Sequence, residues 1–158
     1  MRAEASGLAA LERSLKKMPV DFVNVDLEVE SHEPLDYLAL ELADSEVRRL
    51  YCGETKGGYV ATFECDKLGE SEPNSLIKEF CDALTQLDER ALKLWEGAHR
   101  KTFDIGYEAN NESDSYRSEI RSDAVQAVAD AGATIMLTIY PKHKSEQDVP
   151  AKSDRSGG

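Results

Sequence analysis

Apolar and polar residues alternate along the segment that follows Pro19. The apolar positions are Val23, Val25, Leu27 and Val29, and the polar positions between them are Asn24, Asp26, Glu28 and Glu30. Successive side chains of a β-strand point to opposite faces of the sheet, so this alternation predicts a strand with one face on a core and the other in water.

Apolar residues also recur at steps of three and four, which is the spacing of one helix face. The helices predicted in this way cover residues 8–18, 35–42, 73–87, 88–101 and 122–131. Leu92, Trp95 and Ala98 are expected to face inward on the fourth of these helices. Ser122 is expected to cap the last helix at its N-terminus, and Gly132 to end it.

Further strands are predicted by the same alternation. They cover residues 47–52, 59–65, 103–107 and 134–140, with a short one at 116–120 and a hairpin loop at 53–58. Gly106 inside a strand indicates a bulge or the close approach of another backbone. The sequence therefore predicts an α+β fold with a mainly antiparallel or mixed sheet of five to six strands and helices packed on one face.

The domain organisation follows from these elements. We expect an N-terminal helix at residues 1–18, a single α+β domain at 19–141 and a disordered tail at 142–158. Few apolar residues occur in the tail, so it has little to bury. A chain of 158 residues is long enough for one domain with a real core.

Acidic residues outnumber basic ones, 31 to 19, and the net charge is −12. This charge argues against nucleic acids and anionic membranes as partners, because both repel a polyanion. No run approaches about 18 consecutive apolar residues, and charged residues interrupt the N-terminal apolar stretch where a secretory signal would need continuity. Three cysteines without a C-x-x-C spacing favour reduced thiols, so we expect a cytoplasmic protein.

The sequence contains no recognisable motif for catalysis, cofactor binding or metal binding. The glycine loop from Gly53 to Gly58 is not followed by Lys and Ser or Thr, so it is a hairpin loop and not a phosphate-binding loop. No histidine pair has the helical spacing of a zinc site. Cys65 and Cys81 fall on apolar faces, whereas Cys52, close to Lys56, is expected to be the least buried thiol. We expect no cofactor, no metal and no identifiable catalytic residue.

The acidic face of the first strand is the main candidate site. Its residues are Asp26, Glu28 and Glu30, followed by Glu33 and Asp36. Such a row could bind a basic protein, hold a cation or supply an acid–base pair, and an ordinary solvated strand face accounts for the same pattern. An alternative cleft would use Asp104, with His32 or a carboxylate of the first strand, between sheet and helices.

The stretch from about Asp21 to Pro141 resembles small bacterial proteins of unknown function. The resemblance is carried by the segments at 26–36 and 103–106 and by the ending at 131–141. Some small acidic bacterial domains of this kind are immunity proteins, which neutralise a toxin. The resemblance thus implies a class of partner, a basic toxin-like protein, and no catalytic residue.

We therefore expect a non-enzymatic binding protein that captures a basic partner by electrostatic attraction. The competing hypothesis is a small hydrolase or ligand-binding domain with a carboxylate pair in a cleft. It requires a polar pocket between sheet and helices and a carboxylate with a raised pKa. A homo-oligomeric structural protein is the third alternative, and the sequence leaves the oligomeric state open.

Overall fold

The computed structural model describes residues 20–65, 72–109 and 115–142. Within these ranges the elements follow the order β1 (Val20–Ser31), α2 (Asp36–Ala43), β2 (Val47–Thr55), β3 (Gly58–Cys65), α3 (Pro73–Thr85), α4 (Glu89–Gly97), β4 (Arg100–Ala109), α5 (Ser122–Asp130) and β5 (Thr134–Tyr140). The predicted helix at 8–18 and almost all of the predicted tail lie outside the described residues.

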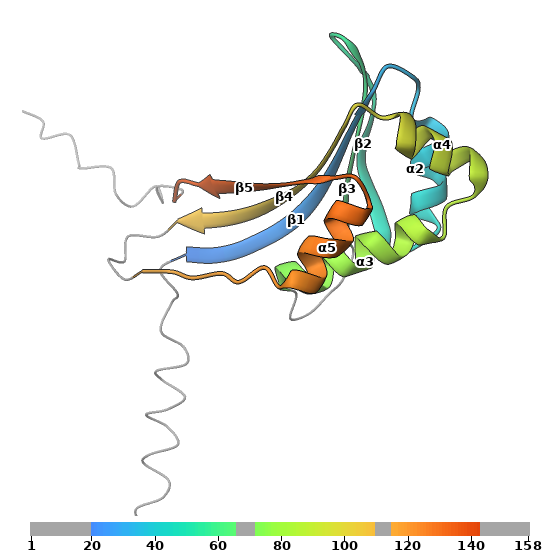
Figure 1. Cartoon of the computed structure of the whole chain (residues 1–158). Helices are drawn as coiled ribbons and strands as arrows, with labels where there is room; N and C mark the ends of the chain where they lie inside the picture. Colours follow the sequence, from blue (N-terminus) through green and yellow to red (C-terminus); the bar gives the residue numbers. More distant parts are fainter. Residues whose placement is uncertain (1–19, 66–71, 110–114, 143–158) are drawn as a thin grey trace, which may run out of the picture.

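The five strands form one sheet in the order β2-β3-β1-β4-β5. Strand β1 lies at its centre and pairs antiparallel with both β3 and β4. Strand β5 pairs parallel with β4, and α5 provides the crossover that a parallel connection needs. All four helices lie on the same side of the sheet (Figure 1). The α+β prediction with helices on one face is confirmed.

The side chains of strand β1 alternate between a face toward the helices and a face away from them. Val25, Leu27 and Val29 are fully buried toward the helices, as the alternation predicts. Val23 was expected on the same face, but 54% of it is exposed. The register shifts between Phe22 and Asn24, so Val23 is an extra residue in a bulge. The bulge lies opposite Gly106, where the glycine within the strand pointed to such an irregularity.

Helix α3 contributes more buried side chains to the core than any other described helix. Leu76, Ile77 and Phe80 of this helix are buried, and the Phe80 ring meets that of Phe103 on β4 edge to face at 5.7 Å. Burial of this kind, at roughly 25 cal/mol per Å² of apolar surface, is the main stabilising contribution. It keeps the helices on one face, and no described element covers the other face of the sheet, which we call the uncovered face.

Several local predictions are wrong. The hairpin loop is a short turn, since β2 and β3 extend to Thr55 and Gly58. Arg100 and Lys101 belong to β4 and not to a helix end, and residues 116–120 form no strand. Leu92 is exposed on α4. Arg121, rather than Ser122, occupies the cap position of α5, without a side-chain cap bond. No helix in the described part of the chain is long and apolar enough to span a membrane.

Candidate functional site

Three acidic residues lie side by side across the uncovered face of the sheet. In the strand register Asp26 of β1 is opposite Glu64 of β3 on one side and opposite Asp104 of β4 on the other. Side chains at directly opposed positions are about 5 Å apart at Cβ, so the carboxylates crowd one another. We call Glu64, Asp26 and Asp104 the acidic row.

Neighbouring side chains satisfy the two outer carboxylates. Arg48 of β2 forms an ion pair with Glu64. The Thr138 hydroxyl of β5 donates to the Asp104 carboxylate, with oxygen separations of 2.7 and 2.9 Å. The Asn24 amide donates to Asp26 at 3.1 Å and to Glu64 at 3.0 Å. Strands β1, β2 and β5 thus each contribute a side chain that holds the acidic row in place.

Asp26, at the centre of the row, is the carboxylate whose charged form is disfavoured by its surroundings. Burial raises its pKa above the ordinary value of 3.8, and the charge of Asp104 raises that pKa further. Among the described residues, the side chain bonded to Asp26 is the neutral amide of Asn24, whereas Glu64 is paired with the guanidinium of Arg48. The row therefore holds negative charge that its own neighbours only partly neutralise.

Glu28 and Glu30, the other two candidate residues on β1, differ in how far nearby cationic side chains neutralise their charge. Glu28 lies between Thr62 and Thr102 and makes no ion pair with any described residue. Glu30 lies 3.1 Å from a nitrogen of Arg100 and 3.7 Å from the ring of His99. Glu28 thus extends the negative charge of the row, while Glu30 is largely neutralised. We call Asp26, Glu28, Glu64 and Asp104 the central acidic patch.

The two other candidate residues of the acidic face, Glu33 and Asp36, lie away from the patch. Glu33 is exposed in the turn after β1, where its backbone N–H donates to the Ser31 hydroxyl. Asp36 begins α2 on the helix side, and its carboxylate lies close enough to affect the Cys52 thiol. The structure therefore brings Asp26, Glu28 and Glu30 together on one face but separates Glu33 and Asp36 from them.

The residues predicted for the alternative cleft are also only partly brought together. Asp104 is opposite Asp26, so a carboxylate pair exists. It lies on the uncovered face, however, and not between sheet and helices. His32 follows the end of β1, about 20 Å along the strand direction from Asp26, and stacks on His99 at 4.5 Å. Asp104 thus lies beside Asp26 of β1 as the alternative hypothesis requires, but His32 lies far from Asp26.

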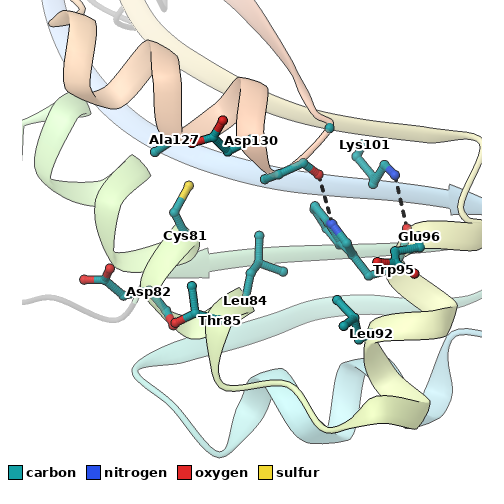
Figure 2. A pocket seen from close by; sticks show the side chains of 12 residues that line it. Cys81, Asp82, Leu84, Thr85, Leu92, Trp95, Glu96, Lys101, Ala127 and Asp130 are labelled. Carbon is teal, nitrogen blue, oxygen red and sulfur yellow. Dashed lines mark hydrogen bonds between the residues drawn. The ribbon is translucent and has the colours of Figure 1, made fainter.

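A cavity of about 590 Å³ lies on the helix side, between α3, α4 and α5 (Figure 2). The Trp95 indole N–H donates to the Ala131 carbonyl at 3.0 Å. The Lys101 ammonium donates to the Trp95 carbonyl at 3.2 Å and lies 5.4 Å from the indole ring centre. These polar groups hold the ends of α4, α5 and β4 together, so they do not point to a ligand.

The cysteines are poorly suited to nucleophilic chemistry. Burial, with the charges of Asp82 and Asp130, raises the pKa of Cys81 to about 11. Burial and the charge of Asp36 also raise the pKa of Cys52, and Arg49 opposes this only in part. Low thiolate content disfavours reaction at neutral pH. In the described residues, no cluster of His, Cys, Asp and Glu has the arrangement of a metal site.

In comparisons with known proteins, no protein family, no curated protein and no solved structure matches this chain. The central acidic patch is therefore the main candidate for a functional site. Sequence reasoning did not single out Glu64. Its polar position between the inward-facing Phe63 and Cys65 was a usable signal, but its proximity to Asp26 depends on strand order.

Proposed function

We propose that this protein is a non-enzymatic binding module that captures a basic partner protein through the central acidic patch. The observation that carries the proposal is the position of Asp26 between Glu64 and Asp104, with its pKa raised and with only an amide as partner. Like charges at opposed positions of a sheet are destabilising. An arginine or lysine of a partner, placed over Asp26 and Asp104, would relieve this repulsion.

The net charge supports the same proposal. A chain of charge −12 attracts a basic partner over distance and accelerates its association. Long-range attraction alone does not hold a partner for long. A long residence time requires desolvated contacts near the centre of the interface. Val23 and Tyr140, both partly exposed beside Gly106, provide apolar surface at one end of the patch. An immunity-like role, in which the partner is a basic toxin, is the specific form of this proposal.

The test is capture from host lysate with three tagged proteins. The patch variant carries Asp26→Asn, Glu28→Gln and Asp104→Asn, and the control carries Glu41→Gln, Asp44→Asn and Glu46→Gln around the end of α2. Both variants lose the same charge. We expect a basic protein that binds the wild type and the control, is lost from the patch variant and dissociates as salt rises. Equal recovery with all three proteins would contradict the proposal.

A second candidate function, acid–base hydrolysis, is favoured by one specific observation. Asp26 and Asp104 are adjacent, and the pKa of Asp26 is raised, which suits a general acid. Hydrolysis of a substrate panel would then depend on pH through Asp26 and would be abolished by either Asp26→Asn or Asp104→Asn. Activity that survives both substitutions would remove this candidate.

A further inference from the structure

Strand β5 forms one edge of the sheet, and among the described strands it pairs only with β4. Its other edge therefore presents backbone N–H and C=O groups to a further strand. The segment from Thr134 to Tyr140 reads TIMLTIY and holds no charged residue and no proline, in a chain of which 32% is charged. Natural edge strands usually carry such residues, because an unprotected edge pairs with other chains.

The opposite edge of the same sheet follows the usual rule. Strand β2 places Arg48, Arg49 and Glu54 along its length, and its register shifts between Arg49 and Tyr51. Charged side chains and bulges both discourage the addition of a further strand. The contrast indicates that the β5 edge, unlike the β2 edge, is left open to a partner.

Apolar side chains of β5 remain exposed as well. Leu137 and Ile139 face the helix side, in register with Ile105 and Tyr107 of β4, but 62% and 66% of them remain exposed. Ile135, at the other end of the strand, packs against the core. The apolar surface of the sheet therefore continues outward past the helices to the β5 edge.

We propose that this edge binds a second copy of the chain, with the two β5 strands antiparallel about Leu137. The sequence of β5 is self-complementary in this register. Leu137 lies opposite Leu137 of the other copy, and Ile135 lies opposite Ile139, so apolar residues meet apolar residues on the helix side. A two-fold contact of this kind closes on itself and does not propagate into fibres.

If two copies associate, electrostatics favours contact at the β5 edge over contact at other parts of the surface. Two chains of charge −12 repel each other, and the uncharged β5 segment keeps like charges apart at the contact. The two-fold axis is perpendicular to the sheet, so both central acidic patches stay on the same face of a continuous sheet. This inference does not depend on the proposed function.

Sedimentation equilibrium of the full chain tests the oligomeric state. We expect the wild type to sediment at twice the 17.5 kDa of one chain at micromolar concentration, and Leu137→Lys to sediment as a monomer. Leu40→Lys on α2 is the matched control, because 62% of Leu40 is also exposed, and it should remain dimeric. A wild type that stays monomeric, whatever else covers the edge, would overturn the proposal.

A cysteine scan tests the register. In the proposed dimer, Leu137→Cys brings two Cα atoms to about 5 Å, within the range of a disulfide. Ile139→Cys places its thiol opposite Ile135 and should not link two copies directly. We expect oxidation to link the Leu137→Cys protein at least tenfold faster than the Ile139→Cys protein and the wild type. Equal linking rates would show that any dimer forms elsewhere.

Discussion

Asp26 and Asp104 lie directly opposite each other on β1 and β4, so two carboxylates of the same charge share one cross-strand position. Thr138 and Asn24 fix the two side chains by hydrogen bonds without cancelling their charge. A pair held in this way is unfavourable in the free protein and becomes favourable when a cation binds over it.

Asp26→Asn should stabilise the free protein at pH 7. The pKa of Asp26 is raised in the folded state, so its ionisation opposes folding; this penalty is absent below the unfolded pKa and grows as the pH rises toward the folded pKa. Asparagine removes the charge and keeps the acceptor for Asn24. We expect a gain of up to about 1 kcal/mol at pH 7, measured by urea unfolding.

The same measurement near pH 3.8, the ordinary pKa of an aspartate, supplies the control. More of the wild-type carboxyl is protonated there than at pH 7, so the stability difference between wild type and Asp26→Asn should be smaller than at pH 7. A variant that is less stable than wild type at pH 7 would show that the charge of Asp26 is already neutralised within the protein.

Gly58 and Gly57, at the turn between β2 and β3, should respond differently to alanine. Gly58 has φ +152°, and a Cβ there would meet the Ser31 carbonyl oxygen at 2.3 Å. We expect Gly58→Ala to destabilise the protein by about 1–3 kcal/mol in urea unfolding. A Cβ on Gly57 would meet nothing within 4 Å, so Gly57→Ala should be nearly neutral. Equal losses would contradict this assignment of strain.

Asp88 should stabilise α4 by capping its N-terminus. Its carboxylate accepts from the Ala91 N–H at 2.7 Å and from the Tyr37 hydroxyl at 2.5 Å, and these bonds hold the pKa of Asp88 below 3.8. The stabilisation is therefore present above the unfolded pKa and is lost as the pH falls through the folded pKa. Asp88→Ala should lower the thermal midpoint by a few degrees at pH 7, and by less in acid.

Glu96→Ala, at an exposed position near the other end of α4, is the matched control for the capping prediction. It should leave the thermal midpoint unchanged. If both variants lose the same stability at every pH, the effect would reflect lost helix charge in general rather than the cap.

Cys81 should react slowly with alkylating reagents in the native protein. A pKa of about 11 in place of 9.0 lowers its thiolate fraction roughly a hundredfold at pH 8. Iodoacetamide labelling followed by mass spectrometry should show slow modification of Cys81 in buffer and rapid modification in urea. Rapid native labelling of Cys81 would contradict the burial that we assign to it.

Much of the secondary structure could be predicted from periodicity alone. The alternation in β1 and the helical spacing in α3 and α5 reflect burial on one face. In β5 the alternation predicts the strand correctly, but of its apolar residues Ile135 packs against the core while Leu137 and Ile139 stay exposed. The position of Val23 could not be predicted, because its bulge depends on pairing with β4. Leu92 shows the opposite case: it has the spacing of a core residue, but 40% of it is exposed.

The candidate site could also be predicted only in part, because periodicity shows which residues of one strand share a face but not which strands are neighbours. Asp26, Glu28 and Glu30 share a face because they lie on one strand, which the alternation reveals. Glu64 and Asp104 join Asp26 only through the order of strands in the sheet, which depends on contacts between distant segments. Asp36 follows closely in sequence but begins a helix on the other side of the sheet.

The most direct test of the central claim is an NMR titration of the uniformly labelled protein with an arginine-rich nonapeptide at low salt. We predict that the largest amide shifts fall at Asp26, Glu28, Glu64 and Asp104, that Asp26→Asn/Asp104→Asn removes them, and that the Glu41→Gln/Asp44→Asn control retains them. Shifts that spread evenly over the acidic surface, or that concentrate on the helix side, would contradict the assignment of the uncovered face as the binding surface.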